Sequence, residues 1–473
     1  MTTTPSPTRR VEQDVSQRSH PVSRLPGPPW YTALENTTRF LRQSLEFSEG
    51  MRRQYGDVVS VPTLVGRLTL VFHPDGVRRV LQENHFNYNK DIPDYQVLSR
   101  LLGKGLLTND GDSWLQQRRL MQPAFHRDRV NAFGAVMTDT TMDWMQRWEM
   151  RRLVDTDEPL DMLKEISALT LSIVCKALFG AALPDEQLER VRRALTTANH
   201  RLSDAFYIPG ILSLPTPQRH QLAAARRELH AVVDELVRQR RADGGERNDL
   251  LAMLLEARDA ETGEGMSDAQ VRDEVLTLLL AGHETTANAL SWTFYLLARH
   301  PEIATRLHQE YRRVLAGRPP AMQDTARLSY GRMVIEESMR LYPPAWAVGR
   351  RALADDEIGG YVIPKGAYVL LFQSVTHRHP DFWEQPDVFD PERFSSEHAA
   401  GRHRFAYFPF GGGPRLCIGN QFALTEAQLI LATILSRYEL RLTPDASVVP
   451  EPLVTLRPRG TLLMTARSFA ELL

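Results

Sequence analysis

The sequence is poor in cysteine: Cys175 and Cys417 are the only two among 473 residues. Two cysteines do not make a disulfide framework, which indicates a reducing compartment. The sequence also lacks any run of 18 uninterrupted apolar residues, so no membrane span is expected. Its formal net charge is −1, and nothing in this balance indicates a nucleic-acid partner. We therefore expect a cytoplasmic, globular protein, monomeric and without nucleic acid.

The first 24 residues lack the apolar stretch of a signal peptide. They are rich in Ser, Thr, Pro and Arg, which is typical of a disordered lead-in. The sequence LPGPPW at Leu25–Trp30 marks the beginning of folded structure. We expect a disordered segment over residues 1–24 and a single domain over residues 25–473.

Two common catalytic motifs are missing. No GxxxxGK[ST] phosphate-binding loop occurs in the chain. His283 and Glu284 begin the HExxH motif of zinc proteases, but residue 287 is alanine, so the second zinc ligand is absent. The sequence therefore excludes an enzyme with a GxxxxGK[ST] phosphate-binding loop and a zinc protease of the HExxH class.

Helical periodicity dominates the chain, and strand-like segments are few and short, without βαβ alternation. The longest predicted helix begins after a Ser267–Gln270 capping box and is stopped by His300-Pro301. At 1.5 Å per residue it is roughly 48 Å long, and its apolar character places it in the middle of the molecule. The sequence predicts a mainly α fold with small β-sheets, including a β-hairpin over 58–72 and a mixed loop over 91–109.

The loop FGGGPRLCIGN, from Phe410 to Asn420, contains Cys417 and precedes a helical apolar run. A helix N-terminus favours negative charge and lowers a thiol pKa, so the sulfur can be a thiolate. A thiolate is a nucleophile or a metal ligand. The alternative is a small buried hydrophobe, but a packing cysteine does not need three consecutive glycines.

The predicted central helix contains AGHETT, Ala281 to Thr286. Gly282 is unfavourable in a helix interior, and Thr285 can bond back to the Ala281 carbonyl, which bends a helix. The pattern indicates a kinked groove for a small molecule or water. A buried helix with a satisfied polar patch is the alternative.

Two further pairs of residues have the spacing of one helix face. Glu337 and Arg340 lie three residues apart and can form an ion pair, which Arg393 could join as a third charge. Trp114 and Arg118 lie four residues apart and together suit an anionic ligand. Taken singly, Glu337 and Arg340 are also compatible with an ordinary surface pair, and Trp114 and Arg118 with a packed tryptophan beside a solvated arginine.

Taken together, these motifs resemble those of the cytochrome P-450 family of haem-thiolate monooxygenases. The cysteine loop matches F-x-x-G-x-R-x-C-x-G, and AGHETT matches [AG]-G-x-[DE]-T-[TS]. The motifs E-x-x-R, D-P-E-R-F and W-x-x-x-R are also present, in the family's order and spacing. The resemblance covers about residues 25–467, and it implies the cytochrome P-450 fold with the long central helix across the haem.

The resemblance also implies roles for individual residues. Cys417 would be the proximal thiolate ligand of the iron of haem b, iron protoporphyrin IX, with Phe410 shielding the sulfur and the glycines bringing backbone amides to it. Thr285 and Glu284 would relay protons toward oxygen. The distal groove would be lined by Ala281 and Gly282. The haem propionates would be held by Trp114, Arg118 and Arg415, with Arg350 and His377 as weaker candidates. Glu337, Arg340 and Arg393 would form a charge network behind the cysteine loop.

The reaction implied is insertion of one atom of O₂ into a hydrophobic substrate, by hydroxylation or epoxidation. Fatty acids, terpenes and macrolide-like intermediates all fit, because the segments implied as substrate walls are mostly apolar. These segments are 92–107, 202–214, Leu278, 345–348 and 454–455. Electrons would come from NAD(P)H through a separate ferredoxin or flavodoxin system. The alternatives are a peroxide-using or redox-neutral haem enzyme on the same fold and a haem-based gas or ligand sensor. The Thr285–Glu284 pair argues against the first, and the absence of a fused signalling or DNA-binding segment argues against the second.

Overall fold

The structure is a computed structural model that describes residues 24–180, 183–207, 211–243, 249–259, 261, 263–444 and 446–469. The expectation for residues 1–24 therefore lies almost wholly outside the described residues.

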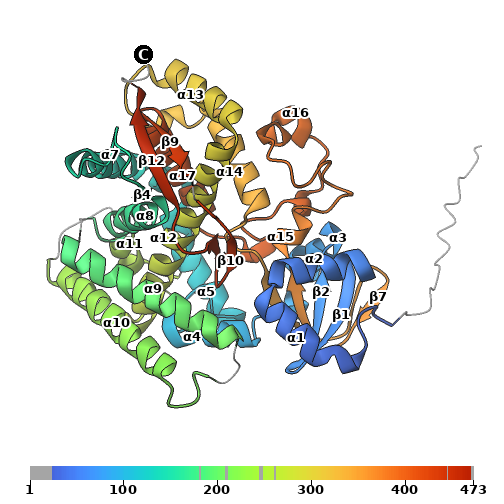
Figure 1. The fold of residues 1–473 in the computed structure, drawn as a ribbon. Coiled ribbons are helices and arrows are strands. Elements are labelled where there is room, and N and C mark those ends of the chain that lie inside the picture. Colours follow the sequence, from blue (N-terminus) through green and yellow to red (C-terminus); the bar gives the residue numbers. More distant parts are fainter. Residues whose placement is uncertain are drawn as a thin grey trace, which may run out of the picture.

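Helices form most of the molecule (Figure 1). In chain order they are α1 (Ala33–Arg42), α2 (Ser44–Tyr55), α3 (Pro74–Arg78), α4 (Pro93–Leu102), α5 (Gly111–Met121), α6 (Arg127–Ala132), α7 (Gly134–Met150), α8 (Met162–Phe179), α9 (Asp185–Tyr207), α10 (Pro217–Asp243), α11 (Leu250–Glu256), α12 (Asp268–Arg299), α13 (Pro301–Leu315), α14 (Ser329–Leu341), α15 (Gln373–Thr376), α16 (Ser396–Ala399) and α17 (Asn420–Leu435).

The strands form small sheets at the edges of the helical body. They are β1 (Val58–Thr63), β2 (Gly66–Val71), β3 (Tyr88–Asn89), β4 (Leu160–Asp161), β5 (Val348–Ala352), β6 (Asp356–Ile358), β7 (Tyr361–Ile363), β8 (Tyr368–Leu371), β9 (Tyr438–Leu442), β10 (Pro450–Pro452), β11 (Leu456–Pro458) and β12 (Leu463–Ser468). The largest sheet has the order β1-β2-β8-β5-β3 and is antiparallel except between β2 and β8. A second sheet has the order β4-β12-β9, and β6-β7 and β10-β11 are two-stranded. The mainly α fold with small sheets is confirmed.

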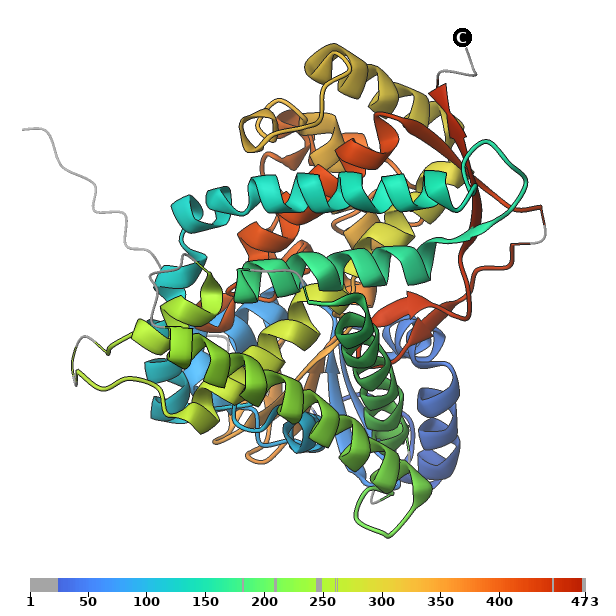
Figure 2. The ribbon, with the colours of Figure 1, turned by 90° about the vertical axis from the view of Figure 1, so that its left-hand side faces the viewer.

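Helix α12 crosses the middle of the molecule (Figure 1) and spans 32 residues. The expected capping box is present: the Ser267 hydroxyl accepts from the backbone of Gln270, whose side chain accepts from the backbone of Ser267. The helix ends at Arg299, before His300, as predicted. It packs on α8, α10, α14 and α17, and Figure 2 shows α7 and α8 running side by side. This long buried helix is therefore a rigid support for the side chains at its middle.

The prediction of a mixed loop over residues 91–109 is wrong in part, because α4 lies within this region. Pro93 occupies the first helical turn, where its missing N–H costs no hydrogen bond. Leu98, Leu101 and Leu102 then pack into the main core. Helix α9 was also not expected, although its apolar residues recur at helical spacing.

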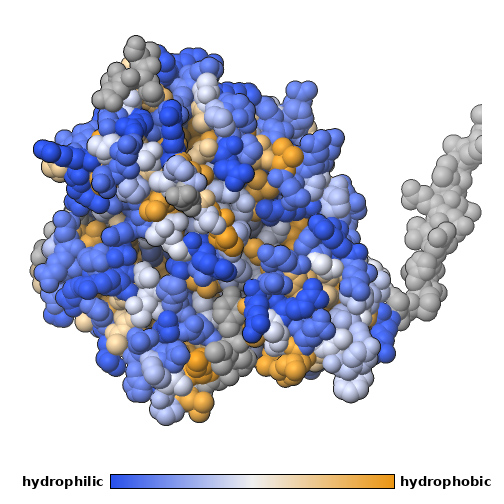
Figure 3. Space-filling model, viewed as in Figure 1, coloured by the Kyte–Doolittle hydropathy of each residue, from blue (hydrophilic) through white to orange (hydrophobic). Residues whose placement is uncertain are grey.

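The surface in the view of Figure 3 is mostly hydrophilic, with small hydrophobic patches. Within the described part of the chain, no helix combines the length and the apolar character needed to cross a membrane.

Candidate functional site

Cys417 lies in a tight loop at the start of α17. Its backbone N–H donates to the Phe410 carbonyl at 3.0 Å. The side chain is accessible, and desolvation by the surrounding protein raises the pKa of its thiol. The Gly419 N–H and Arg118 only partly offset that rise. Burial thus outweighs these two effects on the pKa of the thiol, and coordination to a metal cation would favour the thiolate.

Two of the three consecutive glycines before Cys417 allow close packing. Gly413 has φ +64°, and a Cβ there would lie 1.8 Å from the Leu81 carbonyl oxygen. A Cβ on Gly412 would lie 2.4 Å from the Phe405 ring. Gly412 and Gly413 therefore let the loop approach its neighbours closely and so fix where Cys417 stands. The backbone amide that stabilises the sulfur belongs to Gly419.

An accessible stripe runs along the middle of the otherwise buried α12. Leu278, Ala281 and Thr285 are exposed or half-buried, while most neighbouring residues on the helix are buried. Their spacing of three, four and seven residues places them on one helix face. The Thr285 hydroxyl donates to the Ala281 carbonyl at 2.7 Å, as predicted, and the helix continues without a break. Small side chains on an unbroken helix therefore form this open face.

Gly282 allows α12 and α8 to pack closely, because a Cβ on it would lie 3.2 Å from Val174 of α8. Gly282 is itself half-buried beside Ala281. That Gly282 lines the distal groove stays a prediction.

Glu284 points away from Thr285, toward α9 and the segment after β10. Its Oε1 accepts from the Asn199 amide at 2.5 Å and from the Thr455 hydroxyl at 2.6 Å. Burial raises the pKa of Glu284, while Thr455, Arg457 and Asn199 lower it in part. The carboxyl therefore holds a proton more readily than an ordinary glutamate.

Three cationic side chains predicted to bind an anion lie close to one another. Arg415 lies over the Trp114 ring at 4.0 Å and pairs with Asp110. Arg118 donates to the Leu416 carbonyl at 2.9 Å, next to Cys417. Arg350 donates to the Tyr95 hydroxyl at 3.0 Å and acts on the charge of Arg415. Burial lowers the pKa of Arg118 and lowers that of Arg415 to about 10. A bound anion would favour the charged form of both side chains.

Lys90 belongs to the same cluster, although the sequence analysis did not identify it. Its Nζ donates to the Leu107 carbonyl at 2.6 Å and lies 5.1 Å from the Tyr95 ring centroid. Burial lowers the pKa of Lys90, and Arg415 and Arg350 lower it further. Asp110 is the acidic partner of Arg415, so the cluster of Lys90, Arg118, Arg350 and Arg415 carries an excess of positive charge. No sequence motif surrounds Lys90, and only the fold reveals its place.

His377 does not fit an anion site. Its Nε2 accepts from the Phe408 N–H at 2.9 Å, and its side chain is fully buried. Burial lowers its pKa to about 3, with a further contribution from Arg340 and Arg378, so the ring is neutral. The weaker expectation that His377 binds a propionate is wrong, because a neutral acceptor offers no charge to an anion.

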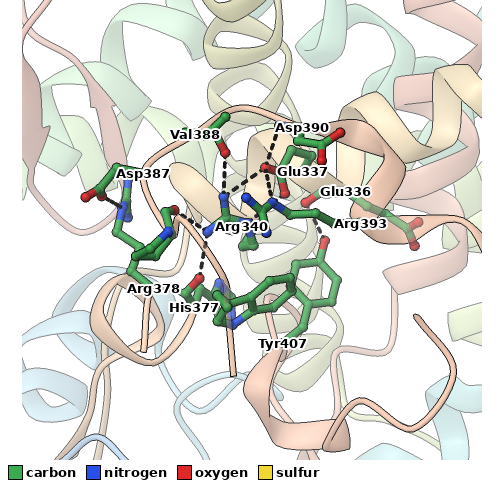
Figure 4. Close-up of polar contacts among 12 residues, drawn as sticks. Glu336, Glu337, Arg340, His377, Arg378, Asp387, Val388, Asp390, Arg393 and Tyr407 are labelled. Carbon is green, nitrogen blue, oxygen red and sulfur yellow. Dashed lines mark hydrogen bonds and ion pairs between the residues drawn. The ribbon is translucent and has the colours of Figure 1, made fainter. Parts of the chain in front are cut away.

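The charge network is present (Figure 4). Arg340 donates to Glu337 at 2.6 and 2.8 Å, and both side chains are fully buried. Arg393 lies 3.5 Å from the same carboxylate. Arg340 also donates to the carbonyls of His377, Pro386 and Val388. The network thus ties α14 to the irregular chain that leads to the cysteine loop.

These residues fit an anionic metal cofactor. Among the described residues, no group of three His, Cys, Asp or Glu could hold a metal ion, so a metal at Cys417 must bring its other ligands with it. An accessible sulfur and a cationic cluster for carboxylates supply what haem requires. A surface pocket of about 630 Å³, lined by residues of α7, α8 and α9, contains none of these residues.

Comparisons with known proteins agree with this geometry. The family described as Cytochrome P450 matches residues 25–464. The chain is 36% identical over 433 residues to cyclooctat-9-en-7-ol 5-monooxygenase of Streptomyces melanosporofaciens, covering 89% of this chain and 92% of the relative. It is 34% identical to pentalenene oxygenase of Streptomyces avermitilis, covering 91% and 94%.

A crystal structure of the cytochrome P450DA heme domain superposes with a TM-score of 0.86 at 31% identity, covering 94% of this chain and 98% of that domain. The family match, the relatives and the shared fold span the cysteine loop, the central helix and the charge network alike. The chain therefore belongs to the cytochrome P450 family and is a cytochrome P450 monooxygenase.

Proposed function

We propose that this P450 binds haem b with Cys417 as the thiolate ligand and oxidises a neutral polycyclic terpene. Haem with a thiolate ligand supplies the activation of O₂, because the sulfur donates electron density that favours O–O cleavage. Lys90, Arg118, Arg350 and Arg415 would bind the propionates, with the Trp114 ring beneath Arg415. Phe410 packs in the core beside the loop and would shield the sulfur.

Thr285 and Glu284 would manage protons on the distal face. The Thr285 hydroxyl donates its proton to the Ala281 carbonyl, so its lone pairs remain available to accept from water or substrate oxygen. The raised pKa of Glu284 favours its protonated form, so this carboxyl can supply a proton. The open stripe of α12 leaves space beside Thr285 for the reacting carbon.

The observation that carries the substrate class is the aliphatic character of the open stripe and of the segments expected to surround it. Leu278 and Ala281 form the stripe, and Leu106, Val348 and Val454 lie in the expected walls. An apolar wall of this kind binds ligands by burial of apolar surface. The relatives named for cyclooctat-9-en-7-ol and pentalenene share more than a third of their aligned residues with this chain, which supports a compact cyclic hydrocarbon skeleton.

A fatty acid is the second candidate. Arg100 of α4 donates to the Ser213 hydroxyl at 3.3 Å and is exposed, so it offers a cation between two expected wall segments. That guanidinium could bind a substrate carboxylate.

A spectral titration distinguishes these substrates. We expect cyclooctat-9-en-7-ol or pentalenene to shift the haem Soret band of the holoprotein, as displacement of a distal water does, at lower concentration than dodecanoic acid. The measurement is the absorbance difference against ligand concentration. If only dodecanoic acid produces a shift, and Arg100→Ala abolishes that shift, the terpene proposal is wrong and the fatty-acid candidate replaces it.

Electrons would reach the haem from NAD(P)H through a separate ferredoxin or flavodoxin with its reductase. The expected compartment is the cytoplasm, and both cysteines are free in the structure, which agrees with a reducing environment.

Replacing Thr285 should uncouple oxygen consumption from product. In Thr285→Ala, we expect most electrons to appear as hydrogen peroxide, because the hydroxyl that positions the proton is gone. Thr285→Ser keeps the hydroxyl and is expected to restore coupling. The measurement is the ratio of peroxide to NAD(P)H consumed with the substrate that gives the spectral shift, and equal coupling in all three proteins would remove Thr285 from the relay.

A further inference from the structure

The carboxyl of Glu284 is held where three elements meet. Asn199 comes from α9, Thr455 follows β10, and Glu284 lies on α12. Asn199 is 3% and Thr455 8% exposed, so both contacts are shielded from solvent. Both hydrogen bonds end on the same oxygen, Oε1, and Oε2 has no hydrogen-bond partner in the described part of the chain.

The direction of the Thr455 hydrogen bond is fixed by its other neighbour. The Asn288 amide, one turn beyond Glu284 on α12, donates to the Thr455 hydroxyl oxygen at 3.0 Å. A hydroxyl has one proton, and since its oxygen already accepts from Asn288, that proton is free to point toward Glu284. Thr455 is therefore a donor to Oε1, and so is the Asn199 amide.

We propose that Asn199 and Thr455 are positioning residues for the proton relay, and that they keep Oε1 of Glu284 an acceptor and confine the transferable proton to Oε2. An oxygen that receives two donors has no room for a proton of its own. The proton of a neutral Glu284 is thus carried on the oxygen that is free to exchange it. This inference rests on the proposed role of Glu284 in the relay and adds the residues that orient it.

The titratable groups nearest this carboxyl come from β10, β11, α9 and α12. Arg457 of β11 favours the ionised form of Glu284. Arg457 itself pairs with Glu451 of β10 at 3.0 Å and contacts His200 of α9 at 3.1 Å, so its charge is partly engaged. On α12, the His283 Nδ1–H donates to the Leu279 carbonyl at 2.7 Å, and the ring is neutral, since burial lowers its pKa to about 4. The two neutral donors, Asn199 and Thr455, therefore determine which oxygen carries the proton.

Infrared titration of the holoprotein tests the proposal without any substrate. The carbonyl stretch of a protonated Glu284 should appear on acidification and be missing in Glu284→Gln, which identifies the band. In Thr455→Val, loss of a donor to the carboxylate should raise the midpoint by about one pH unit, a tenfold change in ionisation. Thr455→Ser keeps the donor and should keep the wild-type midpoint, and Asn199→Ala should behave like Thr455→Val.

Three outcomes would overturn the proposal: a midpoint unchanged in Thr455→Val, an equal shift in Thr455→Ser, or no band that Glu284→Gln removes. A matching upward shift in the pH dependence of peroxide release, abolished in the Glu284→Gln background, would support it. The CO complex of the reduced protein reports separately on the thiolate ligand. A variant that keeps the CO band but not the infrared shift contradicts only the positioning role, whereas a wild-type protein without the CO band contradicts the proposed function.

Discussion

Cys417→Ser is expected to lose the strongly red-shifted Soret band of the reduced CO complex, together with all measurable oxygenation. Serine is close to cysteine in size, so the tight loop held by the Cys417 N–H bond to Phe410 should survive. An alkoxide is far harder to form than a thiolate, however, and the electron donation that favours O–O cleavage would be lost. The measurement is the CO difference spectrum of the freshly prepared, reduced protein, normalised to total haem.

Cys175→Ala is the matched control for that experiment. Cys175 is the other thiol of the chain, is fully buried in α8, and has a pKa raised by burial to about 12. Its thiol is therefore an inert packing group. The control should keep the red-shifted band at full intensity. A band retained in Cys417→Ser, or lost in Cys175→Ala, would contradict the assignment of the axial sulfur.

Short-range patterns were sufficient to predict much of the architecture. The capping box at Ser267 and the His300-Pro301 stop located α12 to the residue, because helix ends are determined by local hydrogen bonds. Glu337 and Arg340 were paired correctly for the same reason, since positions three apart on a helix share a face. The sequence signal for α9 was also present, as Leu188, Val191, Leu195 and Leu202 recur at helical spacing. Helix α4 was predicted as part of a mixed loop, although Pro93 is compatible with the first turn of a helix, which it occupies.

Contacts across the chain could not be predicted in this way. Gly413 needs no side chain because the Leu81 carbonyl approaches it, and 332 residues separate the two positions. Lys90 joins the cationic cluster only after β3 and α4 bring it beside Arg350 and Arg415. Asn199 and Glu284 lie 85 residues apart and meet through helix packing. Each of these three contacts depends on the tertiary arrangement, which residue spacing does not encode. The family motifs, by contrast, identified the residues nearest the sulfur.

Arg340→Ala is expected to destabilise the protein by about 3–5 kcal/mol and to reduce its haem content. The substitution leaves Glu337 buried with Arg393 at 3.5 Å as its remaining cationic partner. It also deprives the carbonyls of His377, Pro386 and Val388 of their donor and removes a guanidinium that lies 4.9 Å from the Trp383 ring centroid. Because these carbonyls belong to the chain that leads into the cysteine loop, the loop should lose its support. Urea unfolding followed by tryptophan fluorescence measures the first effect, and haem absorbance relative to protein the second.

Arg332→Ala on the same helix is the matched control. Arg332 pairs with Glu336 at 3.4 Å, but its side chain is 45% exposed, and such surface pairs contribute no more than about 1 kcal/mol. Arg340→Lys separates charge from geometry, because an ammonium keeps the charge but cannot reach a carboxylate and three carbonyls at once. If the network acts through geometry, Arg340→Lys should resemble Arg340→Ala in stability and haem content. If Arg340→Lys instead resembles the wild type, the charge alone supports the loop. Equal losses of stability and haem content in Arg332→Ala and Arg340→Ala would show that burial of the Glu337–Arg340 pair contributes nothing.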